Sequence, residues 1–458
     1  MIDFPIYQVP YLGNGMTIGL NAVIHVIISH GLAIGAFTMV AYSEWMGFKH
    51  KSIHWETFAK DFIRPLIIII TGVGAVTGVG IWFTISALAP RGTGNMLRVF
   101  FWPWFIEWAV FTSEVIVILI YYFLWDKWTE RKKKTHINLA FFYTFLAMMS
   151  GVLITGILGF MLTSDGWPWD QTFLNAFFNP SFLPQLLVRF GLAFFLGSVF
   201  TISYLMFSKR DPNFKKEALK HFGLIGIVAL SVWFLASVWY FSVVPSTFKT
   251  HSVFSVLTGN LSQYTTWFWI INIAVLLFLS VFAFFAFTGR SGLSKALVIP
   301  AAIFAMLFVA EFERVREFIR GPYLMPGYMY ANQVLLKEVP LLEEKGTIVN
   351  SYWYEKLTDE KNVAKEGLYL FGKNCSVCHT IDGLNDIKVR VKGRSRDGVF
   401  VLVRNSHKMV PFMPPFSGSL AEQRILSEFI YRLANDEFDL EAPSRFISHD
   451  IKIKKGGK

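Results

Sequence analysis

Residues 18–43 read IGLNAVIHVIISHGLAIGAFTMVAYS and contain no Asp, Glu, Lys or Arg. A helix needs about 20 apolar residues to cross the hydrocarbon core of a bilayer, so this stretch is long enough to span a membrane. Similar runs recur along the chain, separated by short polar loops. They predict about eight transmembrane helices, near residues 18–43, 64–89, 99–125, 137–163, 182–207, 222–245, 265–288 and 296–312.

The composition of the whole chain agrees with this prediction. Of the 458 residues, 53% are hydrophobic and only 16% are charged, which is too apolar for a soluble globular protein of this length. We expect no cleavable signal peptide, because Met1–Asn14 lacks a basic leader and the first apolar run reaches spanning length. The predicted fold class is all-α: a polytopic transmembrane helical bundle followed by a small all-α domain.

The distribution of basic residues predicts the orientation. The loops 44–64, 126–136, 208–221 and 289–295 contain sixteen Lys and Arg, whereas the alternate loops contain three. Cytoplasmic loops of membrane proteins are rich in Lys and Arg, so both termini are expected on the periplasmic side of a bacterial inner membrane. The net charge of +11 is then largely a topology signal, and we expect no nucleic-acid partner.

Beyond the last span the sequence becomes mixed and charged. We predict four parts: a membrane bundle over 1–320, an amphipathic connector over 321–359, a compact domain over 360–440 and a tail over 441–458.

Both cysteines of the chain lie in the pentapeptide CSVCH at residues 375–379. The CxxCH pattern is the attachment signature of c-type haem: Cys375 and Cys378 can form thioethers to the two vinyl groups of one haem, and His379 can then bind the iron. A structural zinc site would need further Cys or His ligands, and a redox dithiol would not need the His. One covalent haem c is therefore the leading hypothesis.

The sequence on both sides of CSVCH supports it. Residues 366–374 and 420–430 are typical of amphipathic helices, and MPPF stands between them at residues 413–416. The stretch 360–440 resembles a class I cytochrome c, which implies Met413 as the sixth iron ligand opposite His379. Met409 is the alternative ligand, and His407 is expected at the surface. Because haem c is attached only outside the cytoplasm, this motif agrees with the predicted orientation.

Several ionisable residues lie inside predicted spans, where they are costly and often functional. They are His25 and His30 in the first span, Glu107 and Glu114 in the third, and Glu311 with the following Arg314 at the end of the eighth. Counted along the helices, His25, Glu107 and Glu311 all fall in the outer third of the membrane. This arrangement would suit iron ligation in a buried haem pocket, although the same groups could simply hydrogen-bond one another.

These residues occur in short motifs that resemble those of a known family. The span-one His, GAVTG at residues 74–78, FIE at 105–107 and AEF at 310–312 resemble subunit I of cytochrome bd oxidases. The resemblance implies haem b ligands at His25, Glu107 and Glu311, and catalytic roles for Glu107 and Glu114, with Glu114 in proton delivery. It also implies one or two haems b and a second membrane subunit. Arg314 is placed near Glu311 to meet the propionates of such a haem.

Some features depart from that family. Span five has Arg189 where the family places a His ligand, Ala274 replaces a Met ligand, no Glu-Phe-Gly element follows Gly78, and the outer loop 246–264 is short for a quinol-binding loop. Quinol oxidation at the usual place is therefore not expected, and the appended cytochrome c offers another electron entrance.

The resulting hypothesis is a respiratory cytochrome that passes electrons between a periplasmic cytochrome c or other carrier, its own haem c and haem b in the membrane, ending in oxygen reduction. One alternative is a relay subunit that exchanges electrons with quinone or a partner subunit. Another is a membrane anchor whose bundle has lost its haems.

Overall fold

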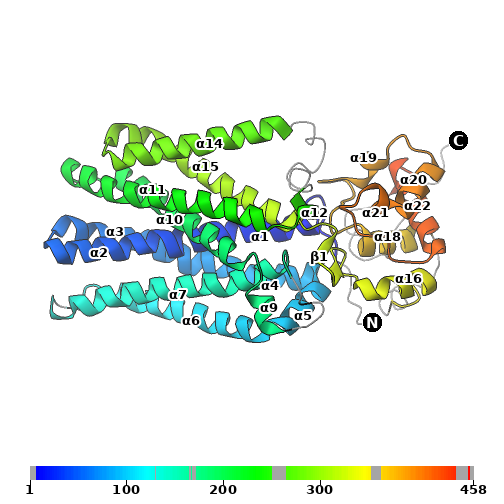
Figure 1. Cartoon of the computed structure of the whole chain (residues 1–458), viewed down its shortest axis with the longest axis horizontal. Coiled ribbons are helices and arrows are strands. Elements are labelled where there is room, and N and C mark those ends of the chain that lie inside the picture. The colour runs from blue at the N-terminus through cyan, green and yellow to red at the C-terminus, as the bar shows by residue number, and fades with distance from the viewer. Residues whose placement is uncertain are drawn as a thin grey trace.

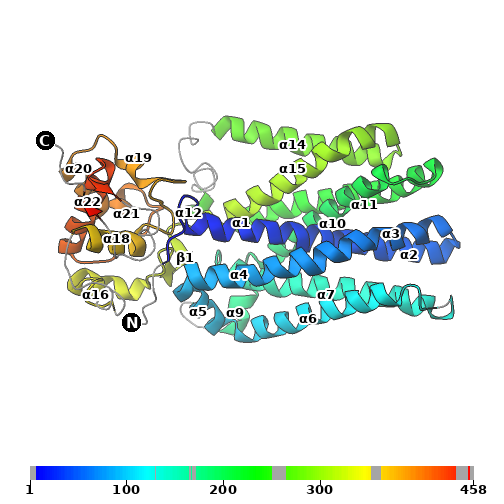
Figure 2. The same cartoon turned by 180° about the vertical axis from the view of Figure 1, so that it is seen from behind.

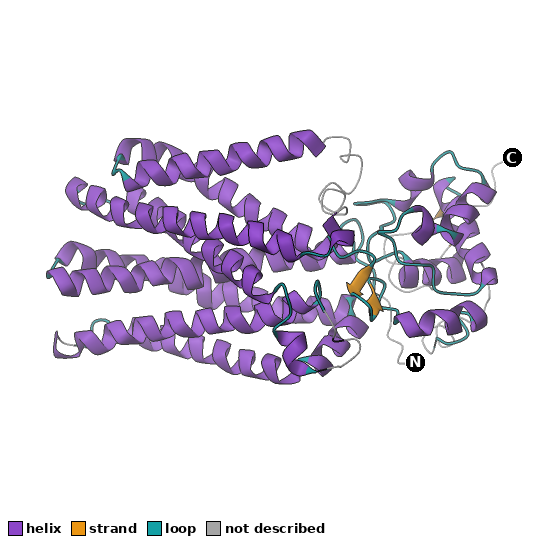
Figure 3. Cartoon of the chain, in the orientation of Figure 1, coloured by secondary structure: helices purple, strands orange, loops and turns teal. Residues whose placement is uncertain are grey.

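Eight long apolar helical segments form most of the molecule (Figures 1 and 3). The computed structural model describes residues 7–128, 130–164, 167, 172–249, 265–351, 363–439 and 452–453. Within these residues, the segments able to cross a membrane are Asn14–His50, Ile53–Leu88, Phe101–Leu124, Lys133–Phe160, Phe173–Phe207, Pro212–Val243, Trp269–Phe287 and Ser291–Arg316. The predicted helical bundle of about eight spans is confirmed.

The first two spans are longer than the sequence predicted. Each comprises an α-helix, a π-helical stretch and a second α-helix: α1 Asn14–Val26, η1 Ile27–Ala36 and α2 Phe37–His50, then α3 Ile53–Ile68, η2 Ile69–Gly74 and α4 Ala75–Leu88. At 1.5 Å per residue such a span measures about 55 Å, so its ends extend well beyond a hydrocarbon core of about 30 Å.

The other membrane helices are single rods joined by short elements. They are α6 Phe101–Leu124, α7 Lys133–Phe160, α10 Phe182–Phe207, α11 Pro212–Val243, α14 Thr265–Phe287 and α15 Ser291–Phe318. The short elements among them are α5 Pro90–Val99, η3 Glu130–Lys132, α9 Phe173–Phe177 and α12 Ser246–Lys249.

The centre of the bundle is the crossing of η1 with α10, where two glycines face each other. A Cβ on Gly35 would lie 2.1 Å from the carbonyl oxygen of Ala193, and a Cβ on Gly197 would lie 2.4 Å from the Cα of Gly35. No side chain fits at such distances, so glycine allows the two backbones to touch. Small residues at contact points are a common device for close helix packing in membranes, where the hydrophobic effect does not drive helices together.

A smaller helical domain follows the last span. It begins with a hairpin of β1 Tyr323–Met325 and β2 Met329–Tyr330 and continues through η5 Leu336–Glu338 and α16 Val339–Lys345. The remaining elements are α18 Val363–Asn374, α19 Ile387–Val391, α20 Arg396–Arg404, α21 Ser406–Met409, α22 Leu420–Ala434, β3 Phe438–Asp439 and β4 Lys452–Ile453. Helices α18 and α22 enclose a separate hydrophobic core that includes Phe371 and Phe429.

The small domain sits on the end of the bundle where α1 begins (Figures 1 and 2). The carbonyl oxygen of Tyr11, just before α1, accepts a hydrogen bond from the backbone N–H of Leu384 at 2.7 Å. Arg91 of α5 pairs with Glu338 of η5 at 2.9 Å. Segment 352–362, most of the tail 441–458 and loop residues 250–264 lie outside the described residues, so the expectations for those parts stay predictions.

Candidate functional site

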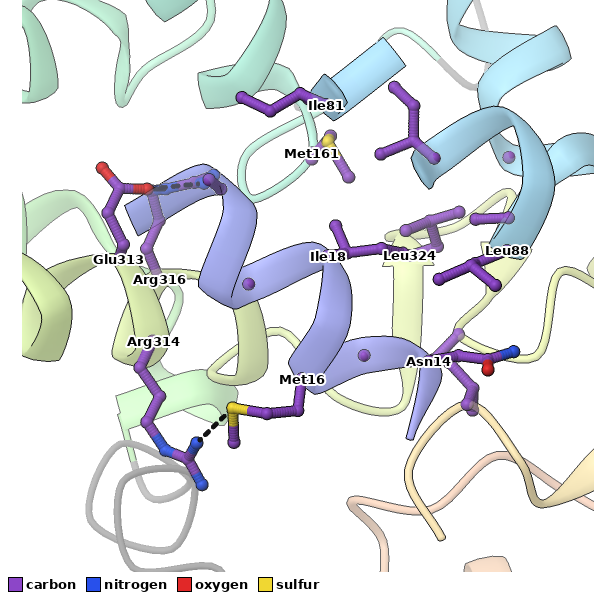
Figure 4. Close-up of a pocket in the computed structure, with 18 of the residues that line it drawn as sticks. Asn14, Met16, Ile18, Ile81, Leu88, Met161, Glu313, Arg314, Arg316 and Leu324 are labelled. Carbon is purple, nitrogen blue, oxygen red and sulfur yellow. Dashed lines mark hydrogen bonds and ion pairs between the residues drawn. The ribbon is translucent and has the colours of Figure 1, made fainter. Parts of the chain in front are cut away.

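A cavity of about 1000 Å³ begins inside the bundle and continues into the small domain (Figure 4). Most of the residues singled out from the sequence line this single space. They are His25, His30, Glu107, Glu114 and Arg314 from the membrane part and Cys375, Cys378, His379, Met409 and Met413 from the small domain. Figure 4 shows Met16 and Ile18 of α1 and Leu324 of β1 around its middle, where the two parts of the molecule meet.

His25 is held by the second span. Its Nδ1 lies 3.2 Å from Oγ1 of Thr77, and that hydroxyl donates its own hydrogen to the carbonyl of Val73 at 2.8 Å. With the hydroxyl hydrogen on the Val73 carbonyl, Oγ1 accepts from His25, and the ring hydrogen is then on Nδ1 and the lone pair on Nε2. Gly78 permits this approach, since a Cβ there would lie 3.0 Å from the imidazole ring. A metal-binding histidine typically has its second nitrogen fixed in this way.

The two glutamates of α6 lie on the cavity wall in different surroundings. Glu107 accepts a hydrogen bond from Oγ of Ser150 at 3.1 Å. Seven residues on, Oε1 of Glu114 is buried and has no hydrogen-bond partner among the described residues, and the same is true of the hydroxyl of Tyr143 and the indole nitrogen of Trp104. All three groups line the cavity. Buried polar atoms without partners are rare, so these indicate a space that water or a bound group normally fills.

In the small domain the CSVCH segment follows α18 directly. Nδ1 of His379 lies 3.2 Å from the carbonyl oxygen of Asn385, which can only accept, so Nε2 again carries the lone pair. The side chain of Asn385 donates to the carbonyl of Cys378 at 2.8 Å and ties the motif to the next loop. The two cysteines form no disulfide. Burial raises the pKa of the Cys375 thiol to about 12, the opposite of what a reactive dithiol shows.

These features fit a covalently bound haem. The cavity wall here combines the two thiols and the oriented imidazole with apolar side chains from α19, α20 and α22, among them Val391, Leu402 and Ile430. Within the described residues, no group of three or more His, Cys, Asp or Glu side chains is arranged to hold a metal ion by itself. Among those residues, the cysteines therefore lack the further ligands of a zinc site.

Both candidate sixth ligands border the cavity. Met413 stands in the MPPF loop, whose Phe416 is buried in the domain core, whereas the side chain of Met409 is 53% exposed. His407, expected at the surface, is half-buried, and its Nδ1 lies 2.7 Å from the carbonyl oxygen of Met413, to which it donates. This contact positions the backbone at Met413 and favours it over Met409.

A buried charge cluster lies on the bundle side of the cavity. Glu313 of α15 pairs with Arg189 of α10 at 3.0 Å and with Arg316 at 2.9 Å. Arg189 also donates to Nε2 of His30 at 3.2 Å, while Nδ1 of that ring lies 3.0 Å from Oγ of Ser29. Both nitrogens of His30 are thus engaged, and its lone pair is not available to a metal.

Glu311 is placed differently from the other predicted ligands. Its carboxylate hydrogen-bonds Asn272 of α14, and it is not among the residues that line the cavity. Glu313, two residues further on, does line the cavity, although it was not among the candidates singled out from the sequence. Arg314 does line the cavity, and Nη1 of its guanidinium lies 3.6 Å from the sulfur of Met16 (Figure 4).

Two comparisons relate this chain to known proteins. Residues 16–240 match the family model of cytochrome bd terminal oxidase subunit I. The solved structure of bd oxidase from Geobacillus thermodenitrificans superimposes with a TM-score of 0.61 at 18% sequence identity, covering 69% of this chain and 88% of that one. No curated protein sequence matches the chain. The family match supports an integral membrane respiratory oxidoreductase. The membrane part of this chain is thus similar in sequence to cytochrome bd oxidase subunit I over residues 16–240 and has the fold of a bd oxidase.

Proposed function

We propose that this chain is a respiratory oxidoreductase subunit that holds haem b in its membrane bundle and one covalent haem c in its small domain. One observation carries the proposal: a single cavity is lined both by His25 and Glu107 and by the CSVCH segment. When bound, haem supplies one-electron transfer and, where an iron position is open, the reduction of oxygen to water. The electron donor would be a periplasmic cytochrome c or another soluble carrier.

In the small domain we assign Cys375 and Cys378 to covalent attachment and His379 and Met413 to the iron. The carbonyl of Asn385 fixes the tautomer of His379, and His407 fixes the backbone at Met413. A His/Met pair leaves no open iron position, which suits electron transfer and excludes substrate binding at this iron.

In the bundle we assign His25 as the iron ligand and Glu107 to the same pocket. Thr77 aims Nε2 of His25, and Ser150 holds the Glu107 carboxylate. Glu114, whose Oε1 has no partner among the described residues, can accept or release a proton at the cavity wall. Glu311 lies outside the cavity lining, and we leave it out of the site.

The contacts of Arg189 bear on where electrons enter the chain. Arg189 is paired with Glu313 and His30 at the place where the resembled family has a haem ligand. A guanidinium in such contacts cannot ligate iron, so we place electron entry at the small domain. We also expect a second membrane subunit, since members of the resembled family pair with one.

The experiment is a haem count on the purified chain. A pyridine haemochrome spectrum should show one haem c and one or two haems b, and a carbon monoxide difference spectrum should show an open iron position. Haem b without carbon monoxide binding would instead support a relay subunit that serves quinone or a partner subunit. A chain with haem c alone would contradict the proposal and leave only a membrane anchor.

A further inference from the structure

Four polar side chains meet at the end of the bundle opposite the small domain. They are Glu44 of α2, Tyr121 of α6, and Lys133 and His136 of α7, called the Glu44 cluster below. The Oε1 atom of Glu44 lies 2.8 Å from Nζ of Lys133 and 2.6 Å from Nδ1 of His136. Its Oε2 accepts from the hydroxyl of Tyr121 at 2.8 Å.

Three of the four residues of the Glu44 cluster are closed to lipid and water. Glu44 and Tyr121 have no exposed surface and His136 is 1% exposed, and none of the four residues lines the cavity described above. Buried ion pairs add little stability over well-packed apolar residues, because the cost of removing charges from water offsets their attraction. Packing three helices together does not by itself require such a group.

One side of the Glu44 cluster reaches the surface. The Lys133 ammonium also contacts Glu56 of α3 at 2.7 Å, and the Glu56 side chain is 40% exposed. On this outer side the Lys133 ammonium also lies over the ring of Trp125. Asp126, the residue after Trp125, pairs with Lys60 of α3. A chain of proton-bearing groups thus runs from water through Glu56 and Lys133 to the buried carboxylate of Glu44.

The other side of the Glu44 cluster faces the cavity. Glu107, Glu114 and Tyr121 are spaced by seven residues and therefore share one face of α6. Ile118 is the last residue of α6 that lines the cavity, and Tyr121 lies three residues, about 4.5 Å along the helix, beyond it.

An aromatic side chain contacts both the Glu44 cluster and the cavity wall. The ring of Phe37 lies 5.4 Å from that of Tyr121 and 4.1 Å from that of Tyr143, measured between centroids. Beyond it, the hydroxyl of Tyr143 and Oε1 of Glu114 have no partner among the described residues.

We propose that the Glu44 cluster is the entrance through which protons reach the cavity from the side opposite the small domain. A proton taken from water at Glu56 passes by way of Lys133 to the Glu44 carboxylate. The Tyr121 hydroxyl donates to Glu44 in the structure. Delivery requires this hydroxyl to turn toward Tyr143 and Glu114, release its proton there and take one from the protonated Glu44 carboxyl on its return, so one proton enters and one is delivered. Phe37 interrupts this route and limits leakage between deliveries. The inference rests on the proposed function, in which reduction of oxygen consumes protons.

The test uses the full-length holoprotein in detergent with ascorbate and a small redox mediator as electron source. Proton uptake during oxygen reduction is followed with a pH indicator dye, together with haem reduction by absorbance, in H₂O and D₂O. Tyr121→Phe removes one hydroxyl but keeps the ring that stacks on His136 at 4.3 Å, so it disturbs packing little. Tyr122→Phe, the next residue on α6, is the matched control, and Glu44→Gln with Glu44→Asp tests the carboxylate itself.

We expect Tyr121→Phe and Glu44→Gln to slow proton uptake by roughly tenfold or more and to raise its solvent isotope effect. Haem content and the rate of haem c reduction should stay at wild-type values, and Glu44→Asp should restore part of the uptake. Wild-type proton uptake in Tyr121→Phe would overturn the inference. A wild-type protein that reduces no oxygen and takes up no protons would overturn the proposed function itself.

Discussion

His25 and His30 stand about one and a half turns apart in the first span, yet hydrogen bonding gives them opposite properties. Thr77 fixes the hydrogen of His25 on Nδ1, whereas Arg189 occupies the Nε2 lone pair of His30. We therefore expect His25→Ala to lose one haem b per haem c, with haem c unchanged because its attachment site is in another domain. His30→Ala should retain the wild-type ratio. Pyridine haemochrome spectra of the three purified proteins provide the measurement.

An unchanged ratio in a folded His25→Ala protein would remove this residue from the haem pocket. Loss of haem b in His30→Ala alone would reverse the assignment of the two histidines.

Met413 and Met409 can be separated by their effect on the reduction potential. A thioether ligand stabilises ferrous iron relative to an imidazole, so Met413→His should lower the potential of haem c while keeping the iron low-spin. Met409→His should leave it unchanged, because we expect Met409 not to bind the iron. Redox titration of the full-length proteins, followed at the haem c absorbance, decides between them. A lowered potential in the Met409 variant only would transfer the sixth-ligand role to that residue.

Among the elements, the crossing of η1 and α10 is the most sensitive to added volume. Gly35→Ala would place a methyl group 2.1 Å from the carbonyl oxygen of Ala193, so the helices must separate. We expect a loss of about 1–3 kcal/mol, seen as a lower melting temperature in detergent. Gly72→Ala is the control, since it lies in the other π-helical stretch with nothing within 4 Å of its Cβ position. Equal melting temperatures for the two variants would show that this crossing is not closely packed.

The sequence predicted the elements well because hydropathy reports directly on spanning segments. Hydropathy was less informative about which face of a helix a polar residue occupies. Glu311 and Glu313 lie at nearly the same depth, but two positions turn a helix by about 200°, and only Glu313 lines the cavity. Depth along the helix could be counted from the sequence, whereas rotation about the axis depends on packing.

The Glu44 cluster was missed for a related reason. Glu44 and His136 stand within segments that charge and hydropathy assigned to the loops 44–64 and 126–136, whereas α2 continues to His50 and α7 begins at Lys133. Pairing a carboxylate with a histidine 92 residues away requires the tertiary structure.

For the whole molecule, the proposed orientation can be tested directly. The basic loops and the small domain lie at opposite ends of the bundle (Figure 1). We expect alkaline phosphatase, which is active only outside the cytoplasm, to be active when fused after Lys458 and inactive when fused in the loop at Lys127. Green fluorescent protein fused at the same two sites should give the reverse pattern. Phosphatase activity at Lys127 but not after Lys458 would invert the proposed topology. It would also invert the side from which protons enter.

The contact between Tyr11 and Leu384 joins a residue that precedes the first span to one that follows the last. During synthesis all eight spans leave the ribosome before the domain that closes the cavity has been made. Until then the cavity in the bundle is open on that side, so the membrane haem that we propose can enter the nascent bundle. The small domain covers this opening once it has matured. The order of synthesis would in this way make the membrane haem bind before the small domain is complete. In a chain whose small domain fails to mature, the membrane haem would remain open to exchange.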